Sequence, residues 1–342
     1  MIEYTTGNLL KADAEALVNT VNCVGFMGKG IALQFKQAFP ENFKDYERAC
    51  KKGEVKIGAI HVHNQHSMIN PKYIFNFPTK NHWKGKSKIE DIESGLISLL
   101  ENIKRFDIES IAIPPLGCGL GGLEWNEVRP LITDVLLEVP NVKVLLFSPQ
   151  GAPIAKEMPV RTSPPRMTLA RAFYIKLIQQ YQEMSYQLTL LEMQKLAYFL
   201  QVAGEPLKLN FEEGKYGPYA KNLNYVLERI EGHFIRGYGD SQKHDQEIEL
   251  INGAIIKADQ FIENNPEANK RLNKVADLIE GFETPYGMEL LASTHWIANK
   301  MKTIDEQEII YGIQSWNERK KKIFQEKHIK ISRERLIKEY WL

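Results

Sequence analysis

The chain has 342 residues, of which 43% are hydrophobic and 25% charged, and its formal net charge is +1. This composition excludes wholesale disorder and collagen-like repeats, and the near-neutral charge argues against tight nonspecific nucleic-acid binding, although a local basic groove remains compatible with it. The sequence has no apolar run of about 18 residues, no secretory signal after Met1 and no CxxC pair among its three cysteines, so it predicts a cytoplasmic protein of two domains with no membrane partner.

The first half of the chain alternates short β-rich runs with amphipathic segments. Predicted strands cover residues 16–21, 73–77 (closed by Pro78), 110–113 and 143–147. Predicted helices cover residues 30–39 (ended by Pro40), 89–103 and 125–139. Strands that alternate with helices predict an α/β layered sheet.

A change of composition follows this α/β pattern. Residues 149–165 are rich in proline, so we predict a linker over residues 151–166. The strand pattern fades beyond it, and helical spacing dominates. The expected domains are therefore residues 1–150 and a mainly α-helical domain over residues 167–342.

Three helical segments are predicted in the second domain. One covers residues 188–202 and is closed by Gly204. Gly217-Pro218 places a proline at the opening turn of another helix, which runs to Ile230. Residues 316–342 predict one or two basic amphipathic helices.

Two glycine-rich loops lie between a predicted strand and a predicted helix. The strand end Val-Asn-Thr-Val-Asn (18–22) leads into Gly-Phe-Met-Gly-Lys-Gly (25–30), and the second loop is Pro-Pro-Leu-Gly-Cys-Gly-Leu-Gly-Gly (114–122). Glycines there let backbone amides approach a phosphate, and the helix N-terminus adds partial positive charge. Each loop alone fits a tight structural turn equally well. Neither matches the P-loop pattern, and neither shows GxGxxG spacing after the first strand, which marks a Rossmann dinucleotide site. Two such loops at one sheet edge could hold a diphosphate.

Together these motifs resemble the macrodomain family, over residues 1–150. The resemblance implies a three-layer α/β/α fold around a mixed sheet, with ADP-ribose in a cleft over the strand ends. It places Asn8 and Leu9 near the adenine, residues 20–22 near the distal ribose and both glycine loops on the diphosphate, although many macrodomains carry Asp where this chain has Asn8. The implied ADP-ribose-binding residues are Asn8, Leu9, Asn19, Thr20, Val21, Asn22, Gly28, Gly30, Ile31, Ala32, Leu33, Gln34, Thr79, Gly117, Cys118, Gly119, Leu120 and Gly121.

Lys80 closes the segment Asn-Phe-Pro-Thr-Lys (76–80). Considered alone, a lysine there is more often a solvated surface residue. The segment is similar to that of the macrodomain branch found in DarG-type antitoxins, and this resemblance implies that Lys80 is the catalytic group. An amine can attack the anomeric carbon C1″ of the distal ribose if its pKa falls from about 10.4 towards ~7–8. Desolvation and nearby Lys84 or Lys86 would lower the pKa, whereas a bound diphosphate would raise it.

Several other side chains are candidates of lower weight. Cys118 fits a small loop filler better than a nucleophile, since no histidine is placed beside it. A metal is not expected at His61, His63 and His66, because no carboxylate or cysteine completes a ligand set. No organic cofactor is expected either. Glu124 and His82 are the candidates for a general acid or base.

Two tryptophans near the site have open roles. Trp125 fits a core anchor better than a platform for a substrate base, whereas Trp83 fits both roles.

The second half resembles the SocA-like antitoxin domain. The resemblance rests on residues 190–199 and on Lys-Tyr-Gly-Pro-Tyr (215–219), and it implies that residues 167–342 bind the cognate DarT toxin, an ADP-ribosyltransferase. The segment 190–199 is equally compatible with a helical core stripe. The basic run 319–322 is usually a solvated helix face, and contact with DNA is the alternative.

The resemblance as a whole implies an antitoxin that releases ADP-ribose from a base of single-stranded DNA, with thymidine as the base. Three alternatives remain: removal of ADP-ribose from protein carboxylates, noncatalytic binding of ADP-ribose, and a DNA-binding repressor that uses the basic tail.

Overall fold

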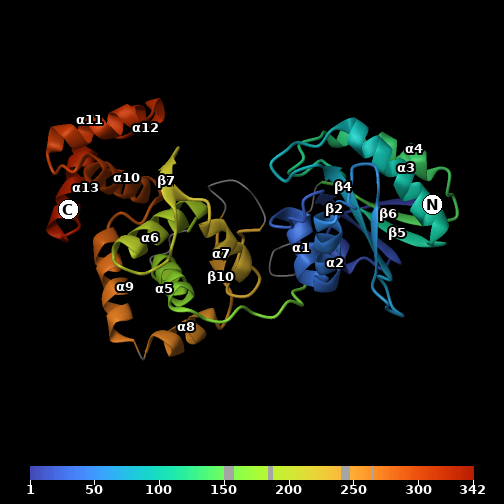
Figure 1. The fold of residues 1–342 in the computed structure, drawn as a ribbon, viewed down its shortest axis with the longest axis horizontal. Coiled ribbons are helices and arrows are strands. Elements are labelled where there is room, and N and C mark those ends of the chain that lie inside the picture. The colour runs from blue at the N-terminus through green and yellow to red at the C-terminus, as the bar shows by residue number, and fades with distance from the viewer. Residues whose placement is uncertain (150–157, 184–187, 240–246, 264) are drawn as a thin grey trace. The chain divides into compact units, whose positions relative to one another are not determined.

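A computed structural model of the chain describes residues 1–149, 158–183, 188–239, 247–263 and 265–342. It divides into two compact units, residues 1–163 and 164–342 (Figure 1). Residues 151–157 of the predicted linker lie outside the described residues. Met158, just beyond them, is buried in the first unit against Leu9 and Phe35.

The first unit is built on a mixed sheet of six strands with the order β1-β6-β5-β2-β4-β3. The strands are β1 (Ile2–Thr5), β2 (Ala16–Asn22), β3 (His61–Asn64), β4 (Tyr73–Lys80), β5 (Ser110–Ile113) and β6 (Lys143–Phe147). All neighbours pair in parallel except β3, which is antiparallel to β4. The central strand β2 is almost wholly buried, as expected for a parallel strand that is covered on both faces.

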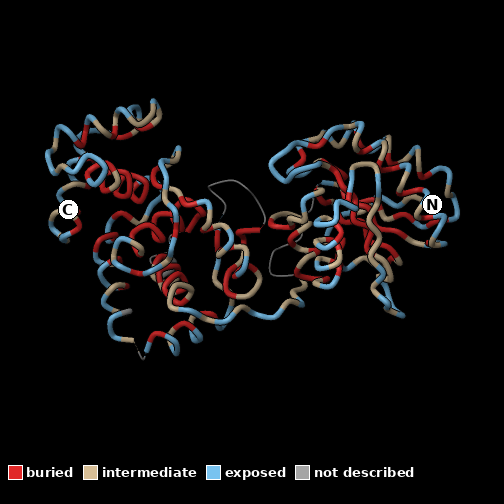
Figure 2. Tube along the Cα trace, in the orientation of Figure 1, coloured by how far each residue is buried: buried red, intermediate tan, exposed pale blue. Residues whose placement is uncertain are grey.

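Helices cover both faces of the sheet. They are α1 (Gly30–Ala38), α2 (Pro40–Lys51), α3 (Ile89–Arg105) and α4 (Trp125–Leu136), with a short 3-10 helix η1 (Leu9–Lys11). One core joins α3 and α4 to Val18 and Phe75, and the opposite face carries Leu17 against Phe35 of α1 and Val21 against Tyr46 of α2. The buried segments in the middle of this unit follow these layers (Figure 2). The predicted three-layer α/β/α fold is confirmed.

Two prolines have structural roles that differ from the predicted ones. β4 does not close at Pro78 but continues to Lys80, because Pro78 still pairs in register with Val21. Pro40, expected only to end a helix, is also the first residue of α2, a position where its missing N–H costs no intrahelical hydrogen bond.

The second unit is mainly helical, as predicted. Its helices are α5 (Leu169–Glu183), α6 (Leu190–Val202), α7 (Leu223–Ile230), α8 (Ala254–Ile262), α9 (Pro266–Ile279), α10 (Pro285–Met301), α11 (Glu306–Trp316), α12 (Glu318–Ile323) and α13 (Glu326–Lys338). Two short antiparallel pairs join β7 (Phe211–Gly214) to β8 (Gly217–Ala220) and β9 (Ile235–Arg236) to β10 (Glu249–Leu250). α6 is buried on nearly every side, so the segment 190–199 is core.

The prediction that a helix begins at Gly217-Pro218 is wrong. These residues belong to β8, and α7 begins only at Leu223. The Gln194 side chain explains the extended backbone, since it accepts a hydrogen bond from the Ala220 N–H (2.9 Å) and donates one to the Ala220 carbonyl (3.2 Å). The basic helices predicted over 316–342 are confirmed as α12 and α13.

The basic run 319–322 is not one solvated face. Lys320 is fully buried, and its Nζ donates hydrogen bonds to Glu289 Oε1 (2.7 Å) and to Ser293 Oγ (3.0 Å). The prediction is therefore wrong for this lysine, whereas Lys321 and Lys322 are exposed. Over the described residues, no helix is both long and apolar enough to cross a membrane.

Candidate active site

Lys80 lies at the sheet edge where β2 and β4 end side by side. The two strands pair in register up to Val21 and Pro78, and a bulge then places Asn22 opposite Lys80. One residue further along each strand, the Cys23 N–H donates to the carbonyl of Asn81 (3.1 Å). The parallel pairing thus puts the lysine beside the start of the first glycine loop.

The Asn22 side chain folds that loop. Its Nδ2 donates to the carbonyl of Phe26 (2.6 Å), and its Oδ1 accepts from the Val24 N–H (3.0 Å). The buried Tyr46 hydroxyl donates to the Asn22 carbonyl (2.6 Å). Gly25 lies in the left-handed region at φ +78°, which explains a glycine in the turn. Asn22 ends β2, and its side-chain amide makes hydrogen bonds within the loop.

The second glycine loop is packed so closely that a side chain at one position would not fit. A Cβ on Gly121 would lie 2.3 Å from both the Gly117 carbonyl oxygen and Ser87 Oγ. The Ser87 N–H also donates to the Gly121 carbonyl (3.1 Å). A Cβ on Gly119, in contrast, would meet nothing within 4 Å. The loop thus leaves open space at Gly119.

The two glycine loops and Lys80 converge. A Cβ on Gly30, at the start of α1, would lie 3.6 Å from a side-chain methyl of Leu120, so the two loops lie close together. Lys80 Nζ donates to the carbonyl of Leu120 (3.4 Å). Burial lowers the pKa of Lys80, and repulsion from Lys86 lowers it further. The structure therefore brings together a lysine that is more readily neutral and two loops rich in backbone N–H groups.

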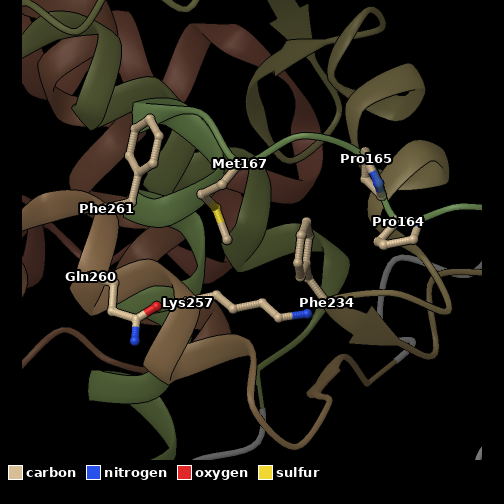
Figure 3. Close-up of a pocket in the computed structure, with 7 residues that line it drawn as sticks. All are labelled: Pro164, Pro165, Met167, Phe234, Lys257, Gln260 and Phe261. Atoms are coloured by element: carbon tan, nitrogen blue, oxygen red, sulfur yellow. The ribbon is translucent and has the colours of Figure 1, made fainter.

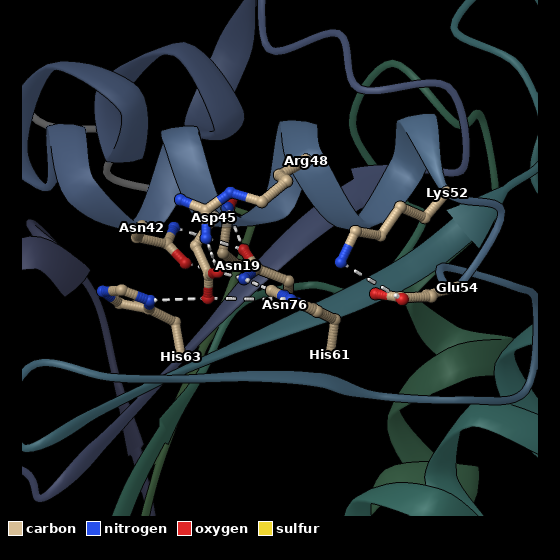
Figure 4. A network of polar contacts seen from close by, with 9 residues as sticks. All are labelled: Asn19, Asn42, Asp45, Arg48, Lys52, Glu54, His61, His63 and Asn76. Atoms are coloured by element: carbon tan, nitrogen blue, oxygen red, sulfur yellow. Dashed lines mark hydrogen bonds and ion pairs between the residues drawn. The ribbon is translucent and has the colours of Figure 1, made fainter.

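A buried asparagine network joins the middle of β2 and β4 to α2 (Figure 4). Asn19, on β2, donates through Nδ2 to Asn76 Oδ1 of β4 (2.9 Å), and Asn76 Nδ2 donates to Asn42 Oδ1 of α2 (2.7 Å). All three side chains are fully buried. Asn19, predicted to contact ADP-ribose, is instead buried and ties β2 to β4, and Asn76 ties β4 to α2.

The histidines of β3 join the same network. Asn76 Nδ2 lies 3.2 Å from His61 Nδ1, and Asp45 Oδ2 lies 2.9 Å from His63 Nδ1 and 3.8 Å from His61 Nε2. Burial lowers the pKa of His61. No group of three or more His, Cys, Asp or Glu side chains within the described ranges is arranged to hold a metal ion.

Several of the other predicted ADP-ribose residues lie inside the protein. Leu9, Val21 and Leu33 are 5%, 3% and 3% exposed and belong to the core under the site. The buried Thr79 hydroxyl donates to the carbonyl of Val21 (3.4 Å). Asn8 caps η1 by accepting from the Leu10 N–H (3.0 Å). The half-buried or exposed members of the predicted set are Asn8, Thr20, Gly30, Ile31, Ala32, Gln34, Cys118, Gly119 and Leu120.

The other candidate side chains, Cys118, Trp125 and Glu124, have different surroundings. Cys118 Sγ donates to the carbonyl of Leu116 (3.4 Å), and burial raises the pKa of its thiol to about 11, which disfavours a nucleophilic thiolate. Trp125 packs against the core of α3 and α4. Glu124 is exposed at the N-terminus of α4.

Sequence reasoning missed Tyr46 and Ser87, which shape the two loops, and Asn42, which completes the network. Tyr46 and Asn42 come from α2, which was not predicted, and a lone serine before a helix gives no sign of its partner. Asn19 and Asn76, polar residues inside apolar strands, were the available sign of a network.

A separate hollow lies in the second unit (Figure 3). It has a volume of about 320 Å³, and it is lined by Pro164, Pro165, Met167, Phe234, Lys257, Gln260 and Phe261. Its walls are mainly apolar, with one cationic side chain.

Comparisons with known proteins identify relatives of this chain. The sequence model of the family described as Macro domain matches residues 18–132. The chain is 45% identical over 338 residues to a DNA ADP-ribosyl glycohydrolase of Thermus aquaticus, covering 99% of this chain and 93% of that relative. It is 38% identical over 181 residues to a DNA ADP-ribosyl transferase–DNA ADP-ribosyl glycohydrolase fusion protein of Thermosipho africanus, covering 48% and 45% of the two chains. Among solved structures, the macrodomain of Mycobacterium tuberculosis DarG is 51% identical, with a TM-score of 0.44 over 44% of this chain and 99% of that one.

Proposed function

The chain belongs to the DarG-type DNA ADP-ribosyl glycohydrolase family, and we propose that it hydrolyses the N-glycosidic bond between ADP-ribose and thymidine in single-stranded DNA. The observation that carries this proposal is Lys80, whose pKa is lowered and whose Nζ lies at the junction of the two glycine loops.

The ADP-ribose would lie across the strand ends. Backbone N–H groups of the two glycine loops and the N-terminus of α1 favour a diphosphate. Asn8 would meet the adenine, and Thr20 would lie near the distal ribose. The open space at Gly119 is where a ligand can approach the backbone of the second loop.

Lys80 would act as a nucleophile. Its neutral amine attacks C1″, a bond forms between Nζ and C1″, and the bond from C1″ to the base nitrogen breaks. That nitrogen keeps the electron pair and takes up a proton, so the unmodified base is restored. The lysine adduct then opens to a Schiff base, and water adds to C1″ and displaces the amine. The sum is one water consumed and one ADP-ribose released.

The environment of Lys80 favours this role. Only the neutral amine has the free electron pair that the attack needs, and both burial and Lys86 favour that form. A negatively charged substrate opposes the shift, so the amine is more readily neutral before the diphosphate binds.

The second unit would bind and inhibit the cognate DarT-type ADP-ribosyltransferase. The Thermosipho africanus relative carries a transferase and a glycohydrolase in one chain, which supports a functional pair. Because α6 is buried, the contact surface within 167–342 would come from other elements. The antitoxin would then protect DNA in two ways, because the first unit removes ADP-ribose from DNA and the second unit inhibits the transferase that attaches it.

Release of ADP-ribose from a thymidine-modified single-stranded oligonucleotide tests the first claim. Wild type should release it, and Lys80→Ala should bind ADP-ribose but not release it. Lys143→Ala is the matched control, because this exposed lysine begins β6 at the opposite end of the parallel strands. Equal release by Lys80→Ala would remove the lysine from the mechanism. Release from modified protein alone would assign a protein substrate.

The toxin claim is tested with the full chain carrying Lys80→Ala, which separates binding from repair. At stoichiometric amounts it should still inhibit DNA modification by the cognate transferase. Undiminished modification of the oligonucleotide would contradict the claim.

A further inference from the structure

The loop between β4 and α3 differs in composition from the rest of the chain. Residues 80–88 read Lys-Asn-His-Trp-Lys-Gly-Lys-Ser-Lys, so four lysines stand in nine residues without an acidic one, in a protein whose formal net charge is +1. Lys84, Lys86 and Lys88 are exposed. The loop is therefore a local cationic patch that begins at the proposed nucleophile.

Aromatic rings are gathered in this patch. Trp83 is 38% exposed, and its ring centroid lies 5.3 Å from that of Phe26 in the first glycine loop. The His82 ring stacks on Trp83 at 5.4 Å, and Lys84 Nζ lies 5.0 Å from the Trp83 ring centroid. An exposed tryptophan with a cation over its ring is a suitable surface for a flat, negatively charged partner.

The loop is fixed to both sides of the site. At its start, the carbonyl of Asn81 accepts from the Cys23 N–H, and at its end the Ser87 N–H donates to the Gly121 carbonyl. Lys86 Nζ lies 2.9 Å from the position that a Cβ on Gly122 would take. The aromatic and cationic side chains are therefore held beside the two loops proposed to bind ADP-ribose.

We propose that this loop binds the DNA strand next to the modified base, with Trp83 and Phe26 stacking a neighbouring unmodified base and Lys84, Lys86 and Lys88 pairing with phosphates. The inference rests on the proposed function, because it assigns the part of the substrate that lies beyond the ADP-ribose. Only a single strand presents base faces freely, so the aromatic pair favours single-stranded over duplex DNA.

Two substrates separate strand binding from ADP-ribose binding. One is an ADP-ribosylated single-stranded oligonucleotide of about ten nucleotides, and the other is the ADP-ribosylated nucleoside alone. Trp83→Ala should lower kcat/KM for the oligonucleotide by roughly 5- to 150-fold, the loss expected for one stacked base, and leave the nucleoside unchanged. Lys84→Gln should reduce the slope of log kcat/KM against log salt by about 0.7 for the oligonucleotide. Tyr4→Ala and Lys143→Gln, exposed positions outside the loop, should change neither.

An equal loss on both substrates with Trp83→Ala would show a general structural role and overturn the inference, as would no loss on either. If wild type releases ADP-ribose from neither substrate, the proposed function has failed, and the loop is tested separately by fluorescence anisotropy with unmodified oligonucleotide. Weaker single-strand binding by Trp83→Ala, but not by Tyr4→Ala, would support the strand surface. Equal binding of duplex and single strand by wild type would overturn it.

Discussion

Replacing Glu289 by Gln tests whether one carboxylate stabilises the buried cations of the second unit. Glu289 is 1% exposed and accepts hydrogen bonds from Lys320 Nζ (2.7 Å) and Arg319 Nη1 (2.6 Å). Lys195, also 1% exposed, adds a third basic side chain, and burial together with repulsion by Lys320 lowers its pKa to about 7. Without the carboxylate, Lys320 keeps Ser293 as a partner but loses its counter-ion.

Removing one partner of a buried ion pair costs about 3–5 kcal/mol, and we expect Glu289→Gln to destabilise the second unit by that amount. The double substitution Glu289→Gln/Lys320→Met should cost about 1–3 kcal/mol less than the sum of the single ones, because it removes both charges. Methionine suits the site, since Lys320 already packs against the rings of Trp316 and Phe324.

Amide hydrogen exchange of the full chain, read by mass spectrometry, measures this locally. Protection should fall in α10 and α12, while the strands of the first unit serve as an internal reference. Two results would refute this reasoning. One is a free energy of opening in α10 that stays within about 1 kcal/mol of the wild-type value. The other is a loss of stability in the double variant that equals the sum of the two single losses.

Three further predictions concern single sites. Gly121→Ala should weaken ADP-ribose binding roughly tenfold, because its Cβ would lie 2.3 Å from a backbone oxygen. Gly119→Ala should also weaken binding, because its Cβ would occupy the open space proposed for the approaching ligand, whereas the exposed Tyr4→Ala should bind as wild type; calorimetric titration compares the three. The rate of ADP-ribose release should rise with pH as Lys80 becomes neutral, and Lys86→Gln should move that rise to higher pH by removing repulsion; initial rates across a pH series show the shift. The pKa of Lys195 is about 7 in the folded chain and 10.5 for an ordinary lysine, so between these pH values the protein takes up a proton when it unfolds. The free energy of unfolding should therefore increase from about pH 7 to pH 10.5. Urea unfolding across this pH range measures the increase, which Lys195→Met should lack.

The sequence predicted most of the first unit because its strands are nearly continuous apolar runs. β5 and β6 begin and end where the pattern places them, and β2 extends by one residue. β1 and β3 were not predicted, since each is a four-residue edge strand with little burial and gives no clear alternation. α2 was missed because Pro40 was taken only as a helix end.

The convergence of the glycine loops and Lys80 was more predictable than the burial of the side chains around them. The glycine loops and Lys80 do converge, since parallel strands end at one edge of a sheet. Leu9, Val21 and Leu33 were expected at the ligand but lie in the core. An apolar residue suits both the protein core and the wall of a ligand cleft, so the sequence alone does not tell which of the two it occupies.

The strand β8 shows a different limit. Its extended backbone depends on pairing with β7 and on the Gln194 side chain, which comes from 26 residues earlier in the chain. A local rule that places proline at the first turn of a helix does not include such a distant partner.

The bulge opposite Asn22 has a consequence for protein engineering. Because one additional residue of β4 stands between the pairs Val21–Pro78 and Asn22–Lys80, chain length at this point sets where the lysine lies. A graft that copies only the lysine into a regularly paired strand would shift its position along the ladder. Transfer of this chemistry to another scaffold therefore requires the whole irregular segment, residues 78–80 together with their partners on β2.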